Sequence, residues 1–150
     1  MEMEQGRNSA LPDEVAFFDA NILVYTDDSS AYEKQQAADG LFHRFRAADR
    51  ASLSVQVLQE YFNTVTRKLG VDPELAQRKV ELLAQARLVR FDGSDAIASI
   101  ELHRLYRISF WDALIVHAAR MARASILYTE DMQHGATIAG VRIVNPFLNL

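Results

Sequence analysis

The first hydrophobic segment of the chain, residues 15–25 (VAFFDANILVY), decides the fold. Its apolar, β-branched and aromatic residues are typical of a strand that is buried on both faces, as in the centre of a parallel sheet. Asp19 interrupts this run, and the apolar residues that follow it are compatible with the start of a helical turn. We therefore expect a central strand that ends at a carboxylate, then a turn over residues 25–30 and a helix over residues 31–48.

Short apolar segments and longer helical patterns alternate along the rest of the chain. Further strands are predicted at 52–54, 88–91, 125–128 and 141–144, and further helices at 54–69, 73–86, 94–106 and 110–123. Asp72 and Pro73 start a helix only a few residues after the stop signal Gly70, which predicts an αα-hairpin. The alternation indicates one α/β domain with a mostly parallel sheet, whose ligands bind beyond the carboxyl ends of the strands.

Length and composition restrict the protein to one ordinary globular domain. The 150 residues include no Cys, which excludes a disulfide framework, a thiolate metal site and a cysteine nucleophile. Residues 1–14 hold four acidic residues and one basic residue without periodicity, so we expect a loose tail there and the domain at residues 15–150. The remaining charges nearly balance, so the net charge of −4 does not exclude a nucleic-acid partner. No membrane span or signal peptide is predicted, and we expect a cytoplasmic protein.

Four carboxylates lie in surroundings that solvated acids rarely occupy. Asp19 follows two Phe residues, Glu60 and Asp112 lie in helices rich in apolar residues, and Asp131 comes directly after a strand. Buried, clustered carboxylates are costly unless a cation neutralises them. Carboxylates without thiolates select a hard cation such as Mg²⁺ or Mn²⁺, and such sites hydrolyse phosphodiesters with one or two ions.

Each acid also has an ordinary structural explanation. Asp112 follows Ser109 by three residues, as in a capping box. Asp19 and Asp131 fit turns, and Glu60 fits a partly exposed helix. Spacing alone does not decide whether the four side chains converge.

Four segments together resemble the motifs of PIN-domain ribonucleases, in particular the toxins of VapBC-type toxin–antitoxin pairs. Residues 18–25 (FDANILVY) look like the opening strand of that family, and residues 54–61 (SVQVLQEY) look like its second motif. Residues 110–115 (FWDALI) and 128–135 (YTEDMQHG) are similar to the third and fourth motifs. The motifs follow the family order, and the resemblance implies a three-layer α/β/α domain with a protruding αα-hairpin.

The resemblance also implies an activity, a cofactor and partners. It implies a Mg²⁺- or Mn²⁺-dependent endoribonuclease in which water attacks the RNA and the products carry 5′-phosphate and 3′-hydroxyl ends. The acidic quartet corresponds to Asp19, Glu60, Asp112 and Asp131. Asn21 and Thr129 match positions that orient the acids or a metal-bound water. Family members are expected to be homodimers, silenced by a VapB-type antitoxin that inserts a basic side chain into the acidic pocket.

Basic residues gather near the ends of two predicted helices, at Arg44 and Arg46 and again at Arg67 and Lys68. Solvated charge is the ordinary explanation for such clusters. The functional hypothesis is that some of them line a groove for the RNA backbone.

Two other functions compete with this interpretation. One is a receiver-like or phosphoryl-transfer domain that uses Asp19 as phosphate acceptor; its phosphatase form needs a second Asp two residues later, where this chain has Asn21. The other is a non-catalytic binding module that keeps the PIN fold. Neither a Gly-rich dinucleotide motif nor a P-loop is present in the sequence.

Overall fold

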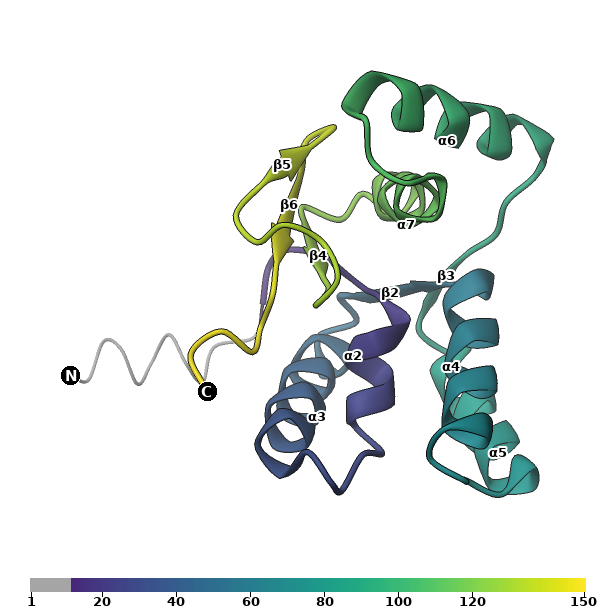
Figure 1. Cartoon of the computed structure of the whole chain (residues 1–150), viewed down its shortest axis with the longest axis vertical. Coiled ribbons are helices and arrows are strands. Elements are labelled where there is room, and N and C mark those ends of the chain that lie inside the picture. Colours follow the sequence, from purple (N-terminus) through teal and green to yellow (C-terminus); the bar gives the residue numbers. More distant parts are fainter. Residues whose placement is uncertain (1–11) are drawn as a thin grey trace.

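The computed structural model describes residues 12–150, which form a six-stranded sheet between two layers of helices (Figure 1). The strands are β1 (Ala16–Phe18), β2 (Ala51–Ser54), β3 (Arg87–Val89), β4 (Ile126–Tyr128), β5 (Thr137–Ile138) and β6 (Val141–Val144). Their spatial order is β3-β2-β1-β4-β6-β5, and every neighbouring pair is parallel except β5 and β6. The predicted α/β fold with a mostly parallel sheet is confirmed, while most of the predicted tail lies outside the described residues.

Helices α2 to α5 lie on one side of the sheet, and α6 and α7 lie on the other (Figure 1). Their bounds are α2 (Ala20–Tyr25), α3 (Tyr32–Ala47), α4 (Val55–Arg67), α5 (Pro73–Leu83), α6 (Gly93–Tyr106) and α7 (Phe110–Met121). Helix α7 contacts four strands of the sheet, and α6 packs on α7. None of the helices in residues 12–150 has the length and apolarity that a bilayer crossing needs.

Strand β1 occupies the centre of the sheet because it pairs with β2 on one side and with β4 on the other. All three of its residues are completely buried. The Phe18 ring stacks on Tyr128 of β4 at 5.3 Å between centroids and meets Phe42 and Phe45 of α3 edge-on. The chain runs outward from β1 through β2 to β3 and then returns to β4, so the strand order reverses between β1 and β4.

The predicted αα-hairpin consists of α4 and α5, which pack on each other. Helix α4 begins after Ser54, whose hydroxyl accepts a hydrogen bond from the backbone of Val57. The connection turns at Gly70, which has a φ of +68° that glycine adopts without steric cost. The Asp72 carboxylate then caps α5 by accepting from two backbone N–H groups, as the sequence predicts. Helix α4 also packs on α2, which places the hairpin beside the end of β1.

Strands β2 and β4 begin one residue away from their predicted starts, and two other strands differ more. Strand β3 covers Arg87–Val89, whereas the prediction was residues 88–91. Strand β5 was not predicted, because its two residues are too short for apolar alternation to show. It pairs antiparallel with β6 through a tight turn in which Ala139 and Gly140 both have positive φ, as two-residue hairpins of type I′ require.

Candidate active site

A cavity of about 470 Å³ opens at the carboxyl ends of β1 and β4, where the strand order reverses. Parallel α/β sheets bind their ligands at such a point. The acidic residues of its lining are Asp19, Asp28, Glu60, Glu130 and Asp131. Among the described residues, Lys68 is the only basic one in this lining. The cavity is therefore suited to a cation or to a cation with its anionic ligand.

Asp19 is the most deeply buried of these acids, with 8% of its surface exposed. It directly follows β1 and caps α2, because its Oδ1 accepts from the Ala20 N–H at 2.8 Å. Its Oδ2 accepts from the Thr129 hydroxyl at 2.9 Å. Burial raises the pKa of Asp19 to about 6; both hydrogen bonds oppose this shift, and the charges of Glu60 and Asp131 add to it. A cation at the cavity would stabilise the ionised form.

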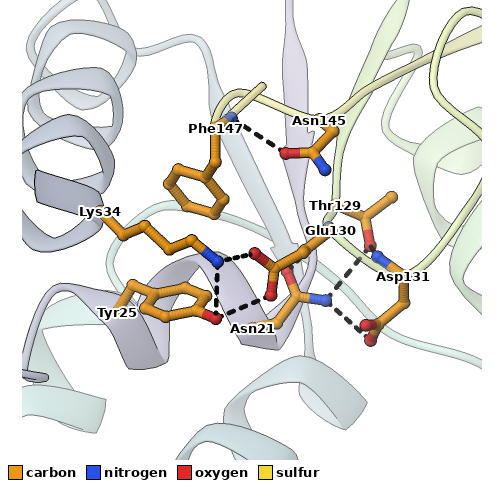
Figure 2. A network of polar contacts seen from close by, with 8 residues as sticks. All are labelled: Asn21, Tyr25, Lys34, Thr129, Glu130, Asp131, Asn145 and Phe147. Carbon is orange, nitrogen blue, oxygen red and sulfur yellow. Dashed lines mark hydrogen bonds and ion pairs between the residues drawn. The ribbon is translucent and has the colours of Figure 1, made fainter. Parts of the chain in front are cut away.

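Asn21 and Thr129 join Asp19 to the segment that follows β4, as Figure 2 shows in part. The Asn21 amide donates to Thr129 Oγ1 at 3.2 Å and to Asp131 Oδ2 at 2.9 Å. The Asn21 carbonyl oxygen accepts from the Glu130 backbone N–H, and Thr129 Oγ1 accepts from that of Asp131. The first turn of α2 thus fixes the position of Asp131. The family resemblance implied an orienting role for Asn21 and Thr129, and these contacts are consistent with that role.

Glu130 is held by a second group of residues that the sequence did not indicate (Figure 2). Its carboxylate forms an ion pair with Lys34 of α3 at 2.5 Å and accepts from the Tyr25 hydroxyl at 2.7 Å. The Lys34 ammonium also lies 4.9 Å from the centroid of the Tyr25 ring and 5.4 Å from that of Phe147. Through the hydrogen bond and the ion pair, Glu130 raises the pKa of both Tyr25 and Lys34. The charge of Glu130 is thus already neutralised inside the protein.

The other two acids of the predicted quartet lie on helices, and of these Glu60 belongs to the lining of the cavity whereas Asp112 does not. Glu60 lines the cavity from α4 and accepts from Gln56 at 2.9 Å; its side chain is exposed, not sheltered as the apolar pattern of the helix predicted. Asp112 lies in the first turn of α7, where its backbone N–H donates to Ser109 Oγ at 3.0 Å. The prediction that Asp112 is buried is only half right, because it is partly exposed at the helix end. Burial raises its pKa, Ser109 lowers it, and the charge of Asp131 raises it.

The donor chemistry of this site fits a hard divalent cation. The charges of Glu60 and Asp131 act on Asp19, and that of Asp131 acts on Asp112, so the four acids share one electrostatic field. None of the four forms an ion pair with another residue of the range 12–150. Within that range, no three acidic or His side chains form a ready-made ligand set. Cation binding therefore requires the acidic side chains to come closer together. Glu60 and Asp131 are both exposed, and Asp131 is in addition held by its hydrogen bond from Asn21.

The PIN domain family profile matches residues 16–137 of the chain. The chain belongs to the PIN-domain family. The match confirms the resemblance seen in the sequence and covers the end of β1, the αα-hairpin, α7 and the segment after β4. No protein with a curated description matches this PIN domain.

Solved structures share the fold of this PIN domain at low sequence identity. A toxin–antitoxin complex from Klebsiella pneumoniae is 21% identical, with a TM-score of 0.65 over 88% of this chain and 98% of the other. Mycobacterium tuberculosis VapC20, a toxin that cleaves the sarcin–ricin loop, is 17% identical, with a TM-score of 0.60 over 77% and 89%. A DNA-bound VapBC from Salmonella typhimurium is 20% identical, with a TM-score of 0.59 over 87% and 96%. At these identities the likeness establishes the common fold.

The basic residues suggested by the sequence lie in different parts of this PIN domain. Lys68 lines the acidic cavity, and Arg67 lies beside it in a small hollow at the end of α4. Arg46 lines a separate hollow between α3 and α5, and Arg44 lies on α3 against the Phe45 ring. Only the pair on α4 is therefore placed to meet a substrate at the acids.

Proposed function

We propose that this PIN-domain protein is a metal-dependent endoribonuclease and the toxin of a type II toxin–antitoxin pair. The observation that carries the proposal is the Asp19 carboxylate, which is buried, has a raised pKa and faces a cavity lined by further acids at the switch point of the sheet. A protein does not maintain such a carboxylate for stability, because burial disfavours its charge. The family and the fold shared with VapC and VapBC structures support the same activity.

In this proposal the acidic quartet holds Mg²⁺ or Mn²⁺. The quartet is Asp19, Glu60, Asp112 and Asp131. When bound, the cation supplies positive charge that lowers the pKa of the attacking water and stabilises the charge developing on the phosphate. Each Asp19 oxygen accepts one hydrogen bond and keeps a lone pair for the cation. Thr129 and Asn21 keep Asp19 and Asp131 oriented, and RNA is cut to 5′-phosphate and 3′-hydroxyl ends.

The partners follow from the same comparison. The Klebsiella structure is a toxin–antitoxin complex and the Salmonella one is a VapBC complex bound to DNA. We propose that this chain pairs with a VapB-type antitoxin, whose basic side chain enters the acidic cavity and blocks it, and that the toxin is a homodimer. Lys68 and Arg67 are placed to contact the RNA backbone next to the acids, whereas Arg44 and Arg46 contact it only if the strand continues over α3.

The test is cleavage of a mixed cellular RNA pool by the purified protein with Mg²⁺, Mn²⁺ or EDTA. Discrete products that need the metal and vanish in Asp19→Asn and Asp112→Asn support the proposal. The matched control is Asp13→Asn, a change at an exposed acid outside the cavity, which should cleave like the parent. Cleavage at the parent rate by Asp19→Asn contradicts the site assignment.

If the protein does not cleave RNA, two binding measurements on the same proteins distinguish the possible reasons. Mn²⁺ binding that depends on Asp19 supports the metal site and directs the search to the substrate or to a bound antitoxin. Binding of beryllofluoride to Asp19 without metal-dependent cleavage favours the phosphoryl-transfer alternative. Absence of both leaves the non-catalytic binding module as the function of the fold.

A further inference from the structure

A second hollow, of about 340 Å³, lies at the same edge of the sheet. It is formed by the ends of β2 and β3 and the first turns of α4. Apart from Ser54, which caps α4, its polar and aromatic lining consists of Gln56 and Gln59 from α4 and Arg90 and Phe91 from the segment after β3. Nothing in the proposed reaction uses these four residues.

Helix α4 contributes lining residues to both the second hollow and the acidic cavity. Gln56 lines the second hollow and donates from its side-chain amide to Glu60 Oε1 at 2.9 Å. Glu60 lines the acidic cavity. The two residues stand one helical turn apart on α4, so a ligand lying across this helix reaches both hollows.

The lining has the groups that recognise an unpaired nucleotide. The Phe91 ring is 37% exposed, and its packing against His117 of α7, at 5.4 Å between centroids, holds it in place. Arg90 is exposed and forms no ion pair with any residue from 12 to 150. The amide of Gln59 carries both donors and an acceptor and forms no side-chain hydrogen bond with the described residues. Single-stranded RNA is bound by aromatic faces that stack bases, by cations at the phosphates and by amides at base edges.

We propose that this hollow is a nucleotide subsite for the RNA strand whose neighbouring phosphate lies at the acidic quartet. The base stacks on Phe91, Arg90 binds the adjacent phosphate, and Gln59 contacts the base edge. This inference rests on the proposed ribonuclease function and adds the source of its sequence preference. We favour RNA over a peptide as the ligand because of Arg90, which has no ion pair among residues 12–150. An RNA strand that crosses α4 from the acidic cavity to the second hollow would bring a phosphate to this guanidinium.

Binding is measured without cleavage in the Asp19→Asn protein, with a fluorescent random-sequence RNA decamer in Mg²⁺ at fixed salt. Adding Phe91→Ala should raise Kd about tenfold, in line with the loss of one base stack. Phe91→Tyr should restore Kd to within about twofold of the parent, since a phenol ring stacks as well as a phenyl ring. Arg90→Gln should weaken binding and reduce its salt dependence. Tyr106→Ala and Arg104→Gln are matched controls on α6, an aromatic residue 40% exposed and an exposed Arg, and should leave Kd unchanged.

Cleavage mapping gives the second readout. With Asp19 intact, sequencing of the cut ends should show that Phe91→Ala weakens the nucleotide preference at one position fixed relative to the cut bond. Thermal unfolding checks that Phe91→Ala and Arg90→Gln remain folded.

The outcomes separate this inference from the function on which it rests. If the parent neither binds nor cuts RNA, the ribonuclease proposal fails and the subsite with it. If the parent is active and both Phe91→Ala and Arg90→Gln match it in Kd and in cut-site preference, the subsite alone is refuted. Such a result would leave the hollow to a protein partner.

Discussion

Replacing Asp19 with Asn removes a charge that destabilises the folded state, so the stability of the variant relative to the parent should depend on pH. Burial raises the pKa of Asp19 to about 6 from the ordinary value of 3.8. A raised pKa means that the folded state binds the proton more tightly than the unfolded state. The parent therefore loses stability as the pH rises from about 3.8 to about 6, and the variant lacks this loss.

The size of the effect follows from the two pKa values. The free energy lost on full ionisation is about 3 kcal/mol, at 1.36 kcal/mol per pKa unit. About 1 kcal/mol of this is already lost at pH 4.5, so about 2 kcal/mol develops between pH 4.5 and pH 7.5. Asn has one acceptor oxygen for the two donors, Ala20 N–H and Thr129 Oγ1, and loses about 1 kcal/mol of hydrogen bonding. That loss is the same at every pH and does not alter the slope.

The assay is urea unfolding followed by circular dichroism, in EDTA, at intervals from pH 4.5 to pH 7.5. The free energy of unfolding of Asp19→Asn minus that of the parent should rise by about 2 kcal/mol over this range. The same difference for Asp13→Asn, an exposed acid, should stay flat. A difference that is constant or falls with pH for Asp19→Asn would refute the argument that burial sets the pKa of this carboxylate.

Three further predictions test the metal site, the ion pair between Lys34 and Glu130, and the backbone conformation at two glycines. Mg²⁺ at 100 times its dissociation constant should stabilise the parent by about 2.7 kcal/mol in thermal unfolding, and Asp112→Asn should lose most of this gain; equal stabilisation of both proteins would contradict a site that includes Asp112. Lys34→Met removes the ion pair to Glu130 and should speed backbone hydrogen exchange after β4 while lowering the RNA cleavage rate; unchanged exchange would show that the pair does not order this segment. Gly70→Ala, at a φ of +68°, should destabilise the protein by about 1 kcal/mol in urea, whereas Gly40→Ala inside α3 has open space and should stabilise it by roughly 0.5–1 kcal/mol; the reverse order would contradict the backbone argument.

The sequence predicted the elements whose signals are local. Residues 15–25 contain both the apolar strand and the acid that caps the next helix, and the structure has β1 followed at once by α2. Asp72 and Pro73 predict the start of α5 for the same reason, since capping depends only on neighbouring residues. Strand β5 was missed because its pairing with β6 arises from a tight turn and not from its own two residues.

The candidate site was predicted less completely than the fold. The acids were recognisable by type and by their position after strands or in apolar helices. Their exposure could not be predicted in the same way, since Glu60 proved to be exposed. The ion pair between Lys34 and Glu130 joins residues 96 positions apart, and neither residue stands out in its own segment. Tyr25 lies in the segment that decides the fold, yet its contact with Glu130 appears only when α2 and β4 are placed side by side. Long-range polar contacts of this kind depend on tertiary geometry and not on sequence pattern.

The hydrogen bond between Asp19 and Thr129 joins residues 110 positions apart, and this has a consequence during synthesis. Asp19 emerges from the ribosome early, whereas the Thr129 backbone N–H donates to Val144 of β6 and the Tyr25 ring packs on Phe147, both of which are synthesised much later. A nascent chain that stops short of β6 carries both Asp19 and Thr129 but lacks the Val144 carbonyl that accepts from the Thr129 backbone N–H. In the proposed ribonuclease, the active centre therefore becomes complete only after β6 has been synthesised, and chains that end before β6 should not cleave RNA.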